Sequence, residues 1–176
     1  LEQRLQMIGS PDEAEELAVT VEDNGGVYVV PAFAGLGAPW WQGDIKAAIL
    51  GMTLGTGKPH VLRAALESIA YQVNDLVKAM TTQAGIKLKE IRVDGGPTKN
   101  TYLMQFQSDM LGSEVLVSDS EEMSAIGAAC AAGIVLGILP ADVTEQIKRT
   151  AYHPQMDEEL RIKKWNGWKR AVVSIL

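Results

Sequence analysis

The sequence has a single cysteine, and this scarcity argues against two kinds of site. Cys130 stands alone among 176 residues, so no disulfide can form within the chain and no cysteine pair can hold a structural metal. His60 and His153 have no Cys, His or carboxylate at ligand spacing, which favours surface or capping histidines over metal ligands. We therefore expect no metal site, a reducing cytoplasmic compartment, and a small buried Cys130 side chain rather than a nucleophile.

The chain also lacks an excess of basic residues. It carries 16 Lys and Arg against 22 Asp and Glu, a net charge of −6, which opposes attraction to nucleic acid over the whole surface. Basic residues do cluster between Arg161 and Arg170, but Asp157, Glu158 and Glu159 come directly before them. Acids before bases complement the dipole of a capped surface helix. We expect no nucleic-acid partner.

Long apolar runs and a leader sequence are missing as well. The Gly- and Ala-rich run from Ala125 to Leu139 is uncharged but shorter than the roughly 20 residues of a membrane span. Its Gly and Ala content favours a buried helix, and we expect no membrane association. The opening residues LEQRLQMIGS contain neither an initiator Met nor a basic-then-apolar leader, so we expect no signal peptide and a start cut from something longer.

Composition and hydrophobic spacing predict an α/β fold. With 47% hydrophobic and 22% charged residues, the chain is one domain or one large piece of a multidomain protein. Helices are predicted from Pro11, over 59–84, 100–111 and 123–139, and at the C-terminus; strands are predicted over 27–33, 47–53, 91–93 and 114–117. The alternation of strand and helix after residue 90 predicts that strands 91–93 and 114–117 pair in parallel.

The stretch IRVDGGPTKNTYLMQF contains the most informative candidate site. A strand ends at Asp94, Gly95 and Gly96 follow, and a helix opens near Pro97. Two adjacent glycines let the backbone approach a flat ligand, and a helix N-terminus directs amides outward. Asn100, about one turn inside, can offer a donor and an acceptor to a base or ribose. On these residues alone, a tight turn that binds nothing is favoured, because the motif is neither a full dinucleotide pattern nor a P-loop.

Other small motifs have structural explanations. Gly35 to Gly37 resembles a phosphate cradle, but no Lys or Ser/Thr follows at P-loop spacing, which favours a structural loop. Arg63 and Glu67 lie one helical turn apart and predict an ion pair on the helix flank. Gly133 and Gly137 are four residues apart, which in a soluble chain indicates close packing on a sheet.

Four longer segments together resemble a known family. They are VYVVPAFAGLGAPWW at 27–41, RAALESIAY at 63–71, RVDGGPTKNTYLMQFQSDM at 92–110 and SAIGAACAAG at 124–133. In order and spacing they resemble the C-terminal half of the glycerol kinases, carbohydrate kinases with the actin/hexokinase-like (ribonuclease H-like) ATPase fold. The segment LMQFQSDML resembles the glycerol kinases more than the related xylulose and gluconate kinases.

The resemblance implies a role for the glycine turn. Residues 1–176 would be a fragment of the C-terminal nucleotide-binding lobe of an enzyme that uses ATP and Mg²⁺ to phosphorylate glycerol. Gly95 and Gly96 would lie along the nucleotide, and Asn100 would contact its adenine end. Pro97 stands where the family often has a small residue, so one amide that could face the ligand is absent.

The resemblance also implies what this stretch lacks. It places the catalytic aspartate, the glycerol-holding residues, the Gly-Thr-Gly phosphate turn and three antiparallel strands upstream, so no catalytic residue is expected in the chain. An unpaired strand edge then predicts self-association into a homo-oligomer. Two alternatives stay open, namely a kinase of another polyol or sugar and a non-catalytic module that binds a nucleotide or a partner.

Overall fold

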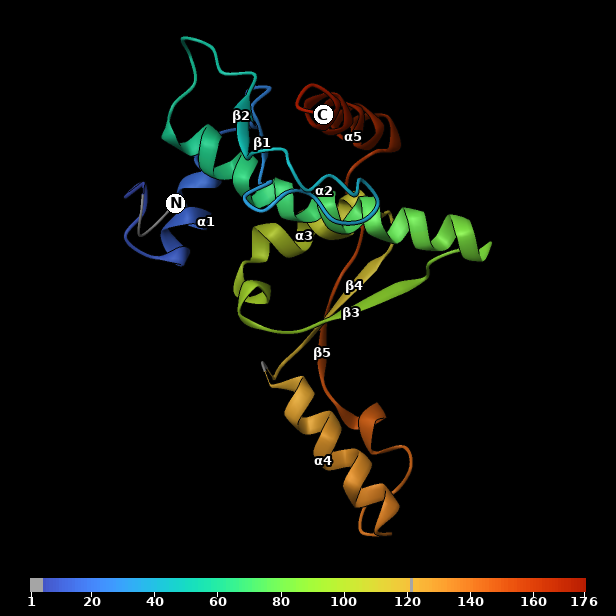
Figure 1. Ribbon diagram of the computed structural model, residues 1–176. Helices are drawn as coiled ribbons and strands as arrows, with labels where there is room; N and C mark the ends of the chain where they lie inside the picture. The colour runs from blue at the N-terminus through green and yellow to red at the C-terminus, as the bar shows by residue number, and fades with distance from the viewer. Residues whose placement is uncertain (1–4, 121) are drawn as a thin grey trace.

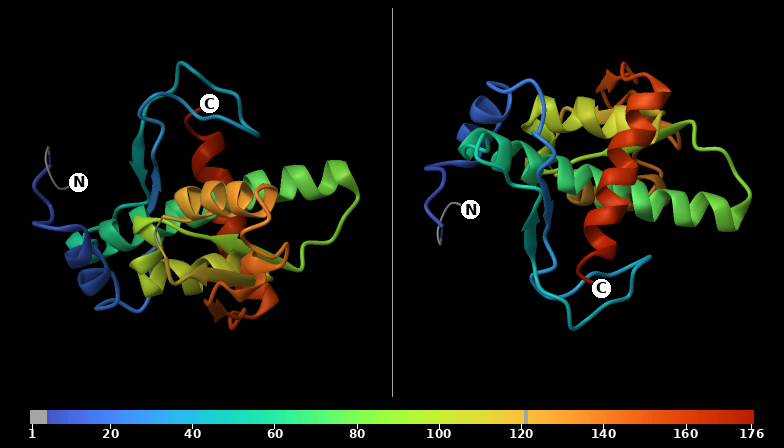
Figure 2. Two further views of the ribbon diagram at one scale, coloured as in Figure 1. Left: turned by 90° about the horizontal axis from the view of Figure 1, so that it is seen from below. Right: turned by 90° about the horizontal axis from the view of Figure 1, so that it is seen from above.

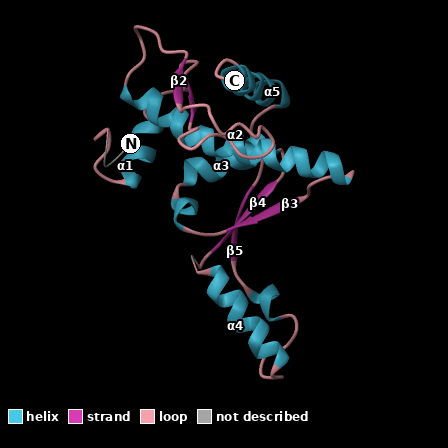
Figure 3. Ribbon diagram, in the orientation of Figure 1, coloured by secondary structure: helices cyan, strands magenta, loops and turns pink. Residues whose placement is uncertain are grey.

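Helices alternate with short strands over residues 5–120 and 122–176, which the computed structural model describes (Figures 1 and 3). The elements in chain order are α1 (Pro11–Ala18), β1 (Tyr28–Val30), β2 (Ala48–Leu50), α2 (Lys58–Ala84), β3 (Glu90–Val93), α3 (Thr101–Leu111), β4 (Glu114–Ser118), α4 (Met123–Val135), β5 (Arg149–Tyr152) and α5 (Glu158–Val173), with 3-10 turns at Gly96–Lys99 and Val143–Gln146. The α/β composition is as predicted.

The strands form two small sheets. β1 pairs with β2 in antiparallel register, and Pro31 directly after β1 ends that strand. In the second sheet β3 and β4 are parallel, with Ile91 opposite Val115, which confirms the predicted pair. β5 lies antiparallel on the other side of β4 and was not predicted, because RTAY is short and lacks the apolar alternation of a typical strand.

The long helix α2 crosses the middle of the molecule, with α3 beside it, between the two sheets (Figure 1). At its start the Gly57 N–H donates to His60 Nδ1 at 3.1 Å, which confirms a capping role for this histidine. At its end Gly85 adopts a left-handed conformation with φ of 65°. The apolar residues whose spacing predicts this helix do not all face the core, because Ile69, Leu76 and Met80 are exposed.

Aromatic side chains from α2, α3 and α5 form the centre of the core. The Tyr71 ring stacks on Trp168 with 5.4 Å between centroids and meets Phe106 edge-on at 5.5 Å. Val30 of β1 and Val115 of β4 belong to the same cluster, so one core joins both sheets. Close aromatic pairs of this kind stabilise a fold beyond the area that they bury.

Glu67 is a fully buried carboxylate that joins four parts of the chain. Its ion pair with Arg63 is present at 3.4 Å, as predicted, but it lies inside the protein and not on an exposed flank. The carboxylate also accepts hydrogen bonds from Asn24 Nδ2 at 2.9 Å and Tyr102 Oη at 2.7 Å, and Lys164 Nζ lies 3.6 Å away. Paired cations and donors are what make a buried carboxylate tolerable.

A second buried carboxylate, Asp75, accepts hydrogen bonds from three tryptophan side chains. Its two oxygens accept hydrogen bonds from Trp40 Nε1 at 3.1 Å, Trp165 Nε1 at 2.8 Å and Trp168 Nε1 at 2.7 Å. Trp40 comes from the loop between β1 and β2, whereas the other two come from α5. Asp75 therefore fixes both the loop and the C-terminal helix against α2.

Helix α4 lies away from the body of the molecule in Figure 1, and the two views of Figure 2 look along that direction, so the helix overlaps the body there. The prediction that the 125–139 run is a buried helix is wrong: the helix is mostly exposed and ends at Val135, a residue that is 85% exposed. Gly133 packs against Leu139 of the following turn and not on a sheet, which corrects the small-residue prediction. Cys130 is buried, as expected. Along the described ranges, no helix combines the length and apolar character that crossing a bilayer requires.

Candidate nucleotide-binding site

The turn after β3 needs glycine at its first position. Gly95 has φ of 97° and ψ of 171°, a conformation that side-chain-bearing residues rarely adopt. The chain then makes one 3-10 turn over Gly96–Lys99 before α3 begins at Thr101. The helix predicted to open near Pro97 is therefore a short turn followed by a separate α-helix.

Gly96 differs from Gly95 because its φ is not in the positive range and no described residue crowds it. It is exposed, and a Cβ built on it would meet no atom of the described residues within 4 Å. The lack of a side chain therefore leaves open space beside the backbone and does not relieve a clash within the fold. Such a surface suits the close approach of a flat ligand.

Asn100 caps α3, which corrects the expectation that it lies one turn inside the helix. Its Oδ1 accepts a hydrogen bond from the Leu103 N–H at 2.7 Å. The Nδ2 group of Asn100 makes no hydrogen bond to the described residues, so it stays available to a ligand. Asn100 can therefore donate to a base, while one lone pair of its acceptor oxygen is already used by the cap.

A pocket of about 540 Å³ lies beside the turn and includes Gly96 and Asn100 in its lining. This volume is in the range of small-molecule sites. Gly95 shapes the turn but is not part of the lining. The other lining residues come from α1, α2, the turn and α3: Pro11, Asp12, Glu15, Leu66, Ile69, Pro97, Lys99 and Leu103.

Sequence reasoning missed the wall formed by α1. Glu15 Oε1 accepts hydrogen bonds from Thr101 Oγ1 at 2.6 Å and from the Tyr102 N–H at 2.9 Å. Together with the Asn100 cap, this contact uses amides that the sequence predicted to point freely outward. An acidic first turn is a common feature of helices, so nothing in the α1 sequence marks Glu15 as part of a site.

Tyr102 connects the start of α3 to the buried network. Burial, and secondarily the Glu67 charge, raises the pKa of its hydroxyl far above the usual value. The hydroxyl therefore stays protonated and donates to Glu67, while Arg63 lies 4.8 Å above the ring. Tyr102 thus links the start of α3, which borders the pocket, to the buried Glu67 network.

The remaining candidates from the sequence have structural roles. In the Gly35 to Gly37 loop, Gly35 has φ of 81° and approaches the Gln42 backbone so closely that a Cβ would collide with it. His153 Nδ1 lies 3.0 Å from Glu114 on the surface. The described residues contain no group of three or more His, Cys, Asp or Glu side chains able to hold a metal ion.

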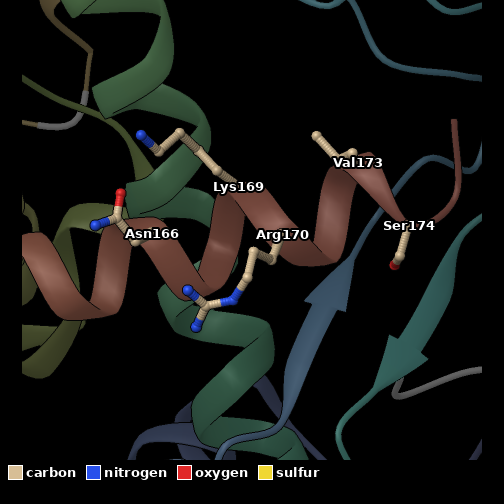
Figure 4. Close-up of a pocket in the computed structure, with 5 residues that line it drawn as sticks. All are labelled: Asn166, Lys169, Arg170, Val173 and Ser174. Carbon is tan, nitrogen blue, oxygen red and sulfur yellow. The ribbon is translucent and has the colours of Figure 1, made fainter.

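A second pocket lies along α5 and is lined by residues of that helix and by its C-cap residue, Ser174 (Figure 4). Asn166, Lys169, Arg170, Val173 and Ser174 form its lining. Figure 4 shows Lys169 and Arg170 extending to different sides of the helix, so the two cations do not converge on one point. The pocket beside the Gly95–Gly96 turn is the better candidate site.

Comparison with known proteins decides the family. The family model for the C-terminal domain of the FGGY family of carbohydrate kinases matches residues 2–136. The chain belongs to the FGGY family of carbohydrate kinases. Within this family, Glycerol kinase 1 of Thermotoga maritima is 49% identical over 179 residues, and the glycerol kinase of Petrotoga mobilis is 48% identical over 175 residues. These alignments cover 100% and 98% of this chain.

Solved structures of FGGY kinases have the same fold. The crystal structure of Plasmodium falciparum glycerol kinase with ADP is 38% identical, covers 99% of this chain and 36% of that chain, and superposes with a TM-score of 0.91. A ligand-bound xylulose kinase from Lactobacillus acidophilus, 18% identical, covers 95% of this chain and 34% of that chain with a TM-score of 0.76, and supports the fold alone. The actin/hexokinase-like ATPase fold is confirmed.

This FGGY chain spans only part of its relatives. It covers 36% of the length of the Thermotoga maritima protein and 35% of the Petrotoga mobilis protein. The activity of those longer proteins therefore comes to this chain only as a proposal.

Proposed function

We propose that residues 1–176 are part of the C-terminal nucleotide-binding lobe of an ATP-dependent glycerol kinase, which transfers the γ-phosphoryl group of ATP to a terminal hydroxyl of glycerol. In this proposal the chain supplies the adenosine-binding wall, made by Gly95, Gly96 and Asn100. The observation that carries it is the likeness, over 99% of the chain, to a glycerol kinase crystallised with ADP.

The geometry of the turn supports a nucleotide at this place. Gly95 turns the chain with a positive φ, and Gly96 leaves its outer side open, as contact with a flat base or a ribose requires. Asn100 Nδ2 can donate a hydrogen bond while its Oδ1 holds the start of α3. Leu66 and Ile69 give the pocket an apolar side.

ATP supplies the phosphoryl group when it is bound, and the residues of this chain hold its adenosine part in position. We also propose Mg²⁺ as a cofactor, held through the nucleotide phosphates by residues outside this chain. The described residues offer no cluster of metal ligands, so no residue here is assigned to it. The catalytic carboxylate and the glycerol contacts are assigned, by the family resemblance, to sequence upstream.

Substrate identity and cellular setting belong to the same proposal. Glycerol is favoured over other polyols and sugars because the glycerol kinases match at 48–49% identity and the xylulose kinase at 18%. We further propose a cytoplasmic enzyme that forms homo-oligomers. The two alternatives, a kinase of another polyol or sugar and a non-catalytic module, are separate outcomes of the following test.

The test is Gly96→Val in the full-length enzyme. A Val side chain enters space that no described residue occupies, so the fold should keep its stability while the nucleotide is displaced. We expect the KM for ATP to rise at least tenfold and the KM for glycerol to stay within twofold. Val at exposed Gly127 of α4, where a Cβ also meets no atom, is the matched control.

Each result has a clear meaning. An unchanged KM for ATP in Gly96→Val would show that the glycine turn does not border the nucleotide and has a structural role only. Phosphorylation of a sugar in preference to glycerol by the wild-type enzyme supports the first alternative. Nucleotide binding without phosphorylation of any polyol or sugar supports the non-catalytic module.

A further inference from the structure

Acidic side chains dominate the charge of the pocket beside the glycine turn. Asp12 and Glu15 of α1 line it, and Lys99 is the cation among the lining residues. Two carboxylates against one ammonium group leave the pocket with a negative balance. A phosphate group entering it would meet net repulsion.

Glu15 is more than a lining residue, because it occupies the N-terminus of α3. Its Oε1 accepts from Thr101 Oγ1 at 2.6 Å and from the Tyr102 N–H at 2.9 Å, while Asn100 takes the Leu103 N–H. Helix N-termini attract anions through such amides and through the positive end of the helix dipole. Here a carboxylate of the chain itself already takes that position.

We propose that Glu15 is a specificity-determining residue: by occupying the start of α3 with a negative charge, it excludes phosphate and reserves the pocket for the uncharged nucleoside part of a nucleotide. This inference rests on the proposed function, which assigns the pocket to ATP. The arrangement is opposite to that of glycine-rich loops that bring phosphate to a helix N-terminus. The same hydrogen bonds join α1 to α3, so Glu15 also keeps two walls of the pocket together.

The experiment compares the binding of adenosine and AMP to the 176-residue chain by calorimetry. The two ligands differ by one phosphate group, so their affinity ratio reports how the pocket treats that charge. For the wild-type chain we expect adenosine to bind and AMP to bind no more tightly. In Glu15→Ala we expect the ratio to move about fivefold toward AMP, a change of about 1 kcal/mol.

Two further variants separate charge from structure. Glu15→Gln keeps an acceptor oxygen for Thr101 and Tyr102 but removes the charge, so it should shift the adenosine-to-AMP affinity ratio toward AMP. Glu16→Gln removes the same charge from the exposed side of α1 and should leave the ratio unchanged. Circular dichroism of each variant checks that the fold is kept, and Glu15→Gln decides the matter if Glu15→Ala does not fold.

The outcomes distinguish the two proposals. If the wild-type chain binds neither ligand, the adenosine site itself fails and the role of Glu15 fails with it. If adenosine binds but Glu15→Gln leaves the ratio unchanged, or Glu16→Gln shifts it equally, the nucleotide site stands and the inference about Glu15 is overturned.

Discussion

Asn100 has two tasks that a single alanine substitution would confuse. Its Oδ1 caps α3, and its Nδ2 is proposed to donate to the nucleotide. Loss of an N-cap costs about 0.5 to 2 kcal/mol of stability, and loss of one hydrogen bond to a ligand costs about 0.5 to 1.5 kcal/mol. The two effects therefore have similar size and need separate measurements.

We predict that Asn100→Ser keeps the stability of the protein but weakens ADP binding about threefold, because serine caps the helix and lacks the amide donor. Asn100→Ala should lower both stability and ADP affinity. Urea denaturation and ADP titration of both variants check this. Equal ADP affinity in wild type and Asn100→Ser would show that the amide does not contact the nucleotide.

Buried tyrosines give the protein a defined alkaline limit. Burial, with the Glu67 charge as the next cause, raises the pKa of Tyr71 and of Tyr102 far above 10. Above pH 10 the unfolded chain releases both protons and the folded chain keeps them, so stability is lost as pH rises. We predict that the free energy of unfolding falls by about 1.4 kcal/mol per pH unit for each of these tyrosines.

Urea denaturation between pH 10 and pH 12, where the tyrosines of the unfolded chain ionise, measures this slope. Tyr102→Phe serves as the comparison, since it removes one of the two groups and should make the slope shallower by about 1.4 kcal/mol per unit. An identical slope in the variant would show that Tyr102 titrates alike in the folded and unfolded states.

The residues of the site differ in how far sequence could reveal them. Gly95, Gly96 and Asn100 are contiguous with a strand end and a helix start, so a local pattern was sufficient to nominate them. Glu15 lies 86 residues from Thr101, and its acidic helical turn is indistinguishable from many others. Glu67 was paired correctly with Arg63, but its burial depends on partners that only the folded chain brings together.

At the scale of elements, the packing of β1 on α5 depends on one glycine. Gly167 is buried in α5, and a Cβ there would collide with the Tyr28 hydroxyl of β1. Tyr28 fills that space and donates to the Lys164 carbonyl at 3.4 Å. A glycine in the interior of a helix normally weakens it, so this position exchanges helix stability for close packing.

We predict that Gly167→Ala destabilises the protein by about 1 to 3 kcal/mol, the usual cost of overpacking, although alanine is the better helix former. Gly127→Ala in α4, where a Cβ meets no atom, should instead stabilise the helix by up to about 1 kcal/mol. Thermal unfolding of the two variants tests the pair. If both shift the melting temperature in the same direction, steric contact with Tyr28 is not the cause.

Sequence located most elements but not which face each one buries. Periodicity placed α2 correctly, yet its buried face includes Glu67 and Asp75, which hydrogen bonds make compatible with the interior. Hydrophobicity alone assigns such residues to the surface. β5 was missed for the related reason that its pairing partner, not its composition, makes it a strand.

At the scale of the whole molecule, apolar surface is left uncovered. Ile69, Leu76 and Met80 on α2 are exposed, as are Val135 and Leu136 at the end of α4. In the described part of the chain β3 is hydrogen-bonded to β4 on one side only. The composition is that of an ordinary globular protein, and it does not record which apolar residues are exposed. It therefore could not predict that α4 stands apart from the body.

We predict that the 176-residue chain self-associates through these surfaces. A free strand edge next to apolar helix faces recruits another chain. Sedimentation velocity over a hundredfold range of concentration should show the average mass rising. A strictly monomeric chain that melts cooperatively would contradict this and show that the fragment closes its own core.

We also predict that the 176-residue chain does not phosphorylate glycerol. Phosphoryl transfer needs a positioned base and ligands for the phosphates, which the family resemblance assigns to sequence outside these residues. The measurement is ATP-dependent glycerol phosphate formation by purified chain. Turnover that a substitution within the chain abolishes would overturn the assignment.

The Glu67 network has a consequence for the timing of folding. The partners of Glu67 are distant in sequence: Asn24 lies 43 residues away, Tyr102 lies 35 residues away, and Lys164 comes from α5. Closing such long loops is entropically costly before the contacts can reward it. A nascent chain on the ribosome would hold Glu67 without its lysine, and Tyr71 without Trp168, until α5 has emerged. The central core therefore closes only after α5 has emerged, and the exposed apolar side chains of α2 and α3 need protection from aggregation until then.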